Sequence, residues 1–319
     1  MNKSILYIFS SKENTIGLVF FKILIMGIIA LILLNSIVMP QFLYGFNASI
    51  IDKVNRLSSI SEPKIVLIGN SNLPFGIRSE LIEEELGMPV VNLGIHGGLG
   101  NRFQENLIRG NIREGDIIVL CHSSYCDEAD KLDPVLTWVT VENHYNLWKY
   151  IPMDEWGNML KAYPTYLKKC INNMEAGISN IQKYECYSRL SFNEQGDNIY
   201  NEAHDEQFEF EEDYLSRASL VDDRVVHRIN KLNKYVEEKG AKLYIAGYPI
   251  AVDSQINNEQ LEDFKEFQNE LEQKMDAKVI SDFTDYFLNY KYFYNTDLHL
   301  TAEGAMLRTQ QLIKDLEAI

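Results

Sequence analysis

The chain has 319 residues and a formal net charge of -16. This length suits one anchor segment with either one large domain or two small ones. An acidic chain lacks the clustered Lys and Arg that displace counterions from nucleic acid, so we expect no nucleic-acid partner. The same charge argues against an electrostatic grip on anionic lipid.

An apolar run extends from Ile16 to Met39 and contains a single charged residue. As a helix it would span roughly 36 Å, enough to cross a bilayer. The part from Ile23 to Leu34 is apolar on every face, which argues against a buried core helix, and no small-x-small cleavage site follows it. Lys3 and Lys12 precede the run. We therefore expect residues 1–40 to be a cytoplasmic tail and single-pass anchor, with the rest of the chain extracytoplasmic.

Residues 41–63 are expected to form a juxtamembrane connector, and residues 64–319 a single domain. Within that domain, short apolar runs alternate with amphipathic segments. The alternation predicts a three-layer α/β/α sandwich around a parallel, flavodoxin-like, five-stranded sheet. The expected strands are Ile65–Ile68, Pro89–Leu93, Asp116–Cys121, Lys242–Gly247 and Lys278–Ile280; the expected helices are Arg78–Leu86, Leu99–Arg109, Arg217–Lys239, Asn258–Met275 and Thr301–Leu316.

The alternation is interrupted between about residues 123 and 215. This segment contains all three tryptophans, many tyrosines and no clear strand. It is too long for a plain loop, so we interpret it as a largely helical insertion after the third strand.

The four cysteines show no C-x-x-C spacing, and no His joins them at zinc-ligand spacing, so we expect no metal. Two interpretations of Cys170 and Cys186 remain open. They form a disulfide outside the cytoplasm, or they are buried thiols.

The first strand ends at Gly69-Asn70-Ser71-Asn72. A serine at this point projects from the carboxyl edge of the sheet, where α/β proteins place their sites. Its own N–H can help to hold an oxyanion. A simple Asn- and Ser-rich turn is the alternative.

The second strand ends in a glycine-rich stretch that begins Asn92-Leu93-Gly94. Glycine lets the backbone approach a substrate closely, so the N–H of Gly94 is a candidate second oxyanion donor. A flexible turn between strand and helix is the alternative.

The last helix is preceded by Asp297 and His299. A catalytic histidine takes the proton of the serine and needs a partner on its other ring nitrogen. Asp297 is the candidate for that partner. Alone, the pair would more often be a surface or helix-cap feature.

Together, these three segments resemble the SGNH (GDSL-like) hydrolase superfamily. Gly69-Asn70-Ser71 stands where the family has Gly-Asp-Ser, Gly94 matches its glycine oxyanion donor, and Asp297 and His299 match its acid-His block. The resemblance covers Lys64 to Cys121 and Lys242 to Leu316. It implies catalysis by Ser71, His299 and Asp297, with no cofactor.

Two positions depart from the family pattern. The third block, Gly-x-Asn-Asp, is absent after the third strand, where Ser123 or Ser124 is a candidate substitute for the missing asparagine donor. The family acid also usually lies three residues before the histidine, where this chain has Thr296.

An anchored, outward-facing domain of this kind resembles superfamily members that modify cell-envelope polymers. The resemblance implies an esterase or O-acyltransferase acting on acyl, most simply acetyl, esters of an extracytoplasmic polysaccharide. A transferase would receive its acyl group from a multispan membrane acyltransferase. The alternative is a catalytically inactive SGNH fold that binds glycan or acts as a scaffold in a cell-envelope assembly.

Overall fold

The computed structural model describes residues 12–38, 41–142, 144–176, 186–200, 221–252 and 258–319. The chain divides into two compact units. One comprises Met1–Gln41 and Pro164–Asn180, and the other comprises Phe42–Tyr163 and Ile181–Ile319. Each unit is described separately below.

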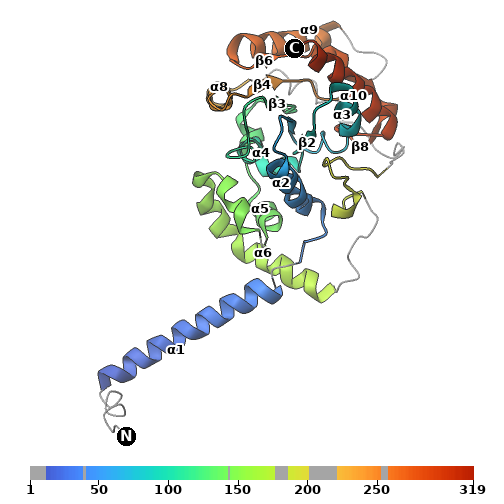
Figure 1. The fold of residues 1–319 in the computed structure, drawn as a ribbon. Helices are drawn as coiled ribbons and strands as arrows, with labels where there is room; N and C mark the ends of the chain where they lie inside the picture. Colours follow the sequence, from blue (N-terminus) through green and yellow to red (C-terminus); the bar gives the residue numbers. More distant parts are fainter. Residues whose placement is uncertain (1–11, 39–40, 143, 177–185, 201–220, 253–257) are drawn as a thin grey trace. The chain divides into compact units, whose positions relative to one another are not determined.

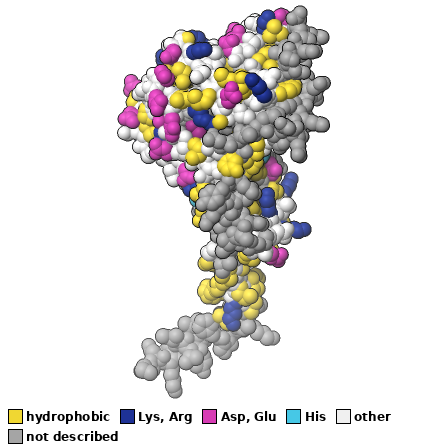
Figure 2. All heavy atoms as spheres, turned by 90° about the vertical axis from the view of Figure 1, so that its right-hand side faces the viewer, with side chains coloured by type: hydrophobic (Ala, Val, Ile, Leu, Met, Phe, Trp, Pro, Cys, Tyr) yellow, Lys and Arg dark blue, Asp and Glu magenta, His cyan; other side chains and the backbone are white. Residues whose placement is uncertain are grey.

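The smaller unit contains the expected N-terminal helix. Helix α1 covers Lys12–Leu33, and a π-helical turn, η2, continues it over Leu34–Val38. The side chains from Gly17 to Leu33 are exposed, and Figure 2 shows them as a hydrophobic surface. In the described residues, no helix has the length and apolarity required to cross a membrane. The anchor therefore stays a prediction from the sequence.

The larger unit is built on a five-stranded sheet in the order β2-β1-β3-β4-β6. All neighbouring strands run parallel, and Ile65 pairs with Val90 on one side and with Ile117 on the other. The expected flavodoxin-like sheet is confirmed, because this is the flavodoxin order when β6 is counted as the fifth strand. The strands are β1 (Ile65–Ile68), β2 (Val90–Asn92), β3 (Ile117–Leu120), β4 (Lys242–Ile245) and β6 (Lys278–Val279).

Both faces of the central strand β1 are buried, as its continuous apolar sequence requires. Helices α3 (Ser79–Leu86) and α10 (Ala302–Glu317) pack on one face through a cluster that includes Ile82 and Leu312. Figure 1 shows α4 (Gly100–Asn106) and α8 (Asp223–Glu237) on the other side of the sheet. Helix α9 (Asn258–Lys274) contacts β6.

Of residues 41–63, expected as a connector, residues 42–63 form part of this unit. Helix α2 (Ser49–Ser59) buries Ile50, Lys53 and Leu57 and packs beside β2. The Nε of Arg56 donates a hydrogen bond of 3.0 Å to the carbonyl of Val90. The segment is therefore attached to the sheet.

The described part of the insertion is helical between residues 134 and 176, apart from short connections, whereas residues 186–200 form turns and one 3-10 helix. Its main helices are α5 (Pro134–Val141) and α6 (Trp156–Ala176). Trp148 lies with its ring centroid 5.3 Å from that of Trp138 and 5.6 Å from that of Trp156. These aromatic rings form a core for the insertion. All four cysteines are described, and none is in a disulfide.

Two small sheets were not expected from the sequence. Strands β5 (Ile250–Val252) and β7 (Phe287–Asn289) pair in parallel, and β8 (Phe293–Thr296) and β9 (His299–Leu300) form an antiparallel hairpin. The remaining elements are short 3-10 helices: η3 (Phe46–Ala48), η4 (Gly97–Leu99), η5 (Asp127–Asp130), η6 (Tyr145–Tyr150), η7 (Met153–Glu155), η9 (Arg189–Ser191), η10 (Phe283–Tyr286) and η11 (Tyr290–Tyr292).

Candidate active site

Ser71 lies in the turn directly after β1, at the carboxyl edge of the sheet. A side chain at Gly69 would place its Cβ 2.8 Å from the carbonyl oxygen of Cys121, so the chain can pass β3 here only with glycine. The Ser71 side chain is partly exposed, whereas the residues that follow it, Asn72 to Ile77, are buried. The serine hydroxyl is therefore accessible on a rigid, buried support.

The turn is held by its own amides and by a buried arginine. Asn70 Oδ1 accepts from the backbone N–H of Asn72 at 2.9 Å and from its Nδ2 at 2.6 Å. Arg308 of α10 donates to the carbonyl oxygen of Asn72 at 2.6 Å and to its Oδ1 at 2.8 Å. These contacts satisfy buried polar groups, so they fix the conformation around Ser71.

His299 comes from the β8–β9 hairpin, in which Asp297 and Leu298 form the two-residue turn. Thr296 Oγ1 accepts from the backbone N–H of His299 at 3.0 Å and so braces the turn. The ring Nε2 of His299 lies 2.9 Å from Ser71 Oγ. The structure thus brings together the predicted serine and histidine, 228 residues apart in the chain.

The other ring nitrogen of His299 faces Asn295, where the sequence predicted Asp297. Asn295 Oδ1 lies 3.0 Å from Nδ1, and the hydroxyl of Tyr187 lies 3.5 Å from the same nitrogen. The Nδ2 of Asn295 donates to that hydroxyl at 3.0 Å. Asn295 can face the ring because it lies on strand β8, whereas Asp297 occupies the hairpin turn.

The surroundings of His299 favour its neutral form. Its side chain is buried, and the ring of Phe75 stacks on it at a centroid distance of 4.1 Å. Burial, together with the charge of protonated His96, lowers the pKa of His299 to about 3. At neutral pH the ring can therefore accept a proton from Ser71.

Gly94 does not present the free N–H that the sequence analysis predicted. Its N–H already donates to Asn92 Oδ1 at 2.9 Å, and its carbonyl accepts from the buried Lys53 Nζ at 2.6 Å. A Cβ at Gly94 would meet Leu73 and Pro74 at 2.5 and 2.4 Å. The glycine is required here for close packing under the Ser71 turn.

Gly97, at the start of η4, lies beside Asn70. A Cβ at this glycine would be 3.5 Å from the Cβ of Asn70 and would meet no other residue's atoms within that distance.

The two serines after β3 differ in their hydrogen-bond partners. Ser123 Oγ accepts from Asn70 Nδ2 at 2.6 Å, whereas Ser124 Oγ lies 3.2 Å from Cys126 Sγ. Of the two predicted substitutes, Ser123 is the one that contacts the turn carrying Ser71.

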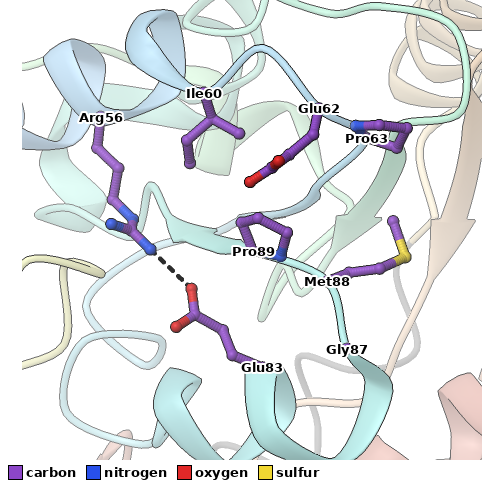
Figure 3. A pocket seen from close by; sticks show the side chains of 8 residues that line it. All are labelled: Arg56, Ile60, Glu62, Pro63, Glu83, Gly87, Met88 and Pro89. Atoms are coloured by element: carbon purple, nitrogen blue, oxygen red, sulfur yellow. Dashed lines mark hydrogen bonds and ion pairs between the residues drawn. The ribbon is translucent and has the colours of Figure 1, made fainter.

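A cleft of about 760 Å³ lies at the opposite, amino edge of the sheet (Figure 3). It is bordered by Pro63 and Pro89, which precede β1 and β2. Two of the charged residues that line it, Arg56 and Glu83, form an ion pair at 2.7 Å. Ser71 and His299 therefore lie at the other edge of the sheet from this cleft.

No protein-family model, curated protein or solved structure matches the chain.

Proposed function

We propose that the chain is an SGNH-type serine esterase or O-acyltransferase that acts on acyl esters of an extracytoplasmic polysaccharide. The observation that carries the proposal is the distance of 2.9 Å between Ser71 Oγ and His299 Nε2. It is the hydrogen bond by which a general base activates a serine hydroxyl.

In the proposed reaction, Ser71 Oγ attacks the acyl carbonyl carbon while its proton passes to His299 Nε2. The proton then moves from His299 to the departing alcohol oxygen, and the acyl group remains as an ester on Ser71. Water or a sugar hydroxyl next attacks this ester and gives its proton to His299, which returns it to Ser71 Oγ. Water yields an esterase, and a sugar hydroxyl yields a transferase.

Charge develops on the carbonyl oxygen in both steps and requires fixed donors. The N–H of Ser71 donates no hydrogen bond to any described residue, so it supports the role predicted for it. The Ser123 hydroxyl, which accepts from Asn70, still has its own hydrogen to donate. We assign the remaining donor to the backbone at Gly97 rather than Gly94, because the Gly94 N–H is already occupied.

The membrane anchor, the extracytoplasmic location and a partner acyltransferase are parts of the proposal that depend on the sequence alone. They are tested separately, by fractionating cells that express the full chain and by protease accessibility of the domain on intact cells. Recovery of the chain in the washed membrane fraction supports the anchor.

The chemistry is tested with acetyl esters. We expect the full chain to release acetate from p-nitrophenyl acetate or from an acetylated oligosaccharide, and Ser71→Ala and His299→Gln to lose this activity. Adding an unacetylated oligosaccharide distinguishes the two outcomes of the second step, because a transferase shifts the acetyl group from water to sugar.

The second candidate is an inactive SGNH fold that binds glycan or acts as a scaffold. It is favoured by one observation, that an uncharged amide faces His299 Nδ1 where a carboxylate was expected. Glycan binding by the full chain that is unchanged in Ser71→Ala, without any ester turnover, would support this candidate.

A further inference from the structure

The strongest feature that the proposed reaction does not yet use is the pair of side chains on the far nitrogen of His299. Asn295 Oδ1 lies 3.0 Å from Nδ1, and Asn295 Nδ2 lies 3.0 Å from the hydroxyl of Tyr187. Both groups are neutral. Every distance in this chain of contacts, from Ser71 to Tyr187, is at most 3.0 Å.

We infer that Asn295 is the positioning residue of His299, so that Ser71, His299 and Asn295 form a triad with an amide as its third member. The inference rests on the proposed function of Ser71 and His299. Asp297, the acid predicted from the sequence, is not the residue that orients the ring.

The hydrogen-bond directions support this assignment. For Nε2 to accept the proton of Ser71 it must carry a lone pair, so the ring hydrogen must be on Nδ1. The partner of Nδ1 must then be an acceptor. Asn295 Oδ1 is an acceptor, and its Nδ2 is directed away from the ring, toward Tyr187.

An amide fixes the tautomer but supplies no negative charge. A carboxylate at this position would also stabilise the imidazolium that forms when Ser71 loses its proton. Here the ring is stacked on Phe75, and both its burial and the nearby His96 disfavour protonation. The site therefore orients its base without raising the base's proton affinity.

The experiment compares Asn295→Ala, Asn295→Asp and Asp297→Asn in the full chain. We expect Asn295→Ala to lower kcat/KM for acetyl esters by about 10- to 100-fold, below the range for loss of a whole general base. Asn295→Asp should keep the turnover that Asn295→Ala loses, because a carboxylate oxygen accepts from Nδ1 in the same place. Asp297→Asn should stay within about twofold of the wild type, because it changes no partner of the ring.

The second readout does not require activity. Histidine ring NMR of the full chain, with His299→Gln to assign the signal, reports the pKa of His299. We expect Asn295→Asp to raise that pKa by at least about one unit, since the new carboxylate favours the charged ring, and Asp297→Asn to leave it unchanged.

The outcomes separate the two proposals. A lower pKa of His299 in Asp297→Asn, or an unchanged pKa in Asn295→Asp, would overturn the role of Asn295 whatever the activity. If only the proposed function is wrong, the wild type will be inactive towards acetyl esters, but Asn295→Asp will still raise the pKa of His299. Tyr187→Phe tests the outer contact, and we expect a loss of turnover smaller than that of Asn295→Ala.

Discussion

Arg308 of the last helix holds Asn72 through two hydrogen bonds, although 236 residues separate them in the chain. The arginine is buried, and it contacts Asn72, the residue next to Ser71. The same helix starts at Ala302, three residues after His299. The last helix therefore supports both His299 and the turn that carries Ser71.

The contact between Arg308 and Asn72 predicts that even a conservative substitution of Arg308 lowers the stability of the protein. Arg308→Lys keeps the charge but cannot reproduce both hydrogen bonds, so we expect a loss of about 1.5–3 kcal/mol in the free energy of unfolding. Lys314→Met, on an exposed position of the same helix, is the control and should change stability by no more than about 0.5 kcal/mol. Urea unfolding measures both, and equal effects would contradict the account.

Gly94 and Gly97, which both follow β2, should differ in how well they tolerate substitution by alanine. Gly94→Ala places a Cβ within 2.4–2.5 Å of Pro74 and Leu73, so we expect a loss of about 1–3 kcal/mol. Gly97→Ala meets Asn70 only at an ordinary contact distance, so its stability should change little. Thermal unfolding of the two variants makes the comparison. A stable Gly94→Ala variant would show that the packing around Gly94 is looser than described.

The low pKa of His299 predicts how kcat/KM of the proposed reaction changes as the pH falls below neutral. The pKa of His299 in the folded state is about 3, whereas the usual pKa of histidine is about 6.5. The His299 ring therefore stays neutral well below pH 6.5. We expect kcat/KM to change by less than about twofold between pH 7.5 and 5.5, whereas an ordinary histidine would lose about tenfold. Circular dichroism over the same range controls for unfolding. A half-maximal rate near pH 6.5 would contradict the prediction.

Lys53 predicts a pH dependence of stability. Burial lowers its pKa to about 7, against the opposing effect of Asp197. Between pH 7 and 10.5 the unfolded state binds more protons at this residue than the folded state, so stability rises with pH, by up to about 1.4 kcal/mol per unit.

We therefore expect the wild type to gain stability relative to Lys53→Met between pH 7 and pH 9. Lys242→Met, at an exposed lysine, should show no such relative change. Urea unfolding at the two pH values measures the difference. A constant gap between wild type and Lys53→Met would show that Lys53 remains charged in the folded protein.

The sheet was predictable because each of its strands is a short apolar run that can be recognised from its own sequence, without knowledge of its partners. Strand β1, Ile65–Ile68, has the bounds expected from the sequence, and the other four strands of the sheet differ by one or two residues at an end. The positions of Ser71 and His299 follow, since a parallel sheet gathers its strand ends on one edge.

Residue-level detail within the site was less predictable. The β8–β9 hairpin lacks an Asn-Gly or Asp-Gly turn signal, so Asn295 was not recognised as a strand residue facing the ring. Hydrogen bonds between residues distant in the chain, such as that of Tyr187 with Asn295, leave no periodic signal in the sequence. Proximity in sequence favoured Asp297, and the hairpin geometry favours Asn295.

The central claim is that Ser71 is an activated nucleophile. The most direct measurement is the mass of the full chain after reaction with a fluorophosphonate probe, which modifies activated serines. The account predicts one adduct, located on Ser71 by peptide mapping, that is lost in Ser71→Ala and strongly reduced in His299→Gln. An unmodified wild type, or an adduct that persists in Ser71→Ala, would contradict it.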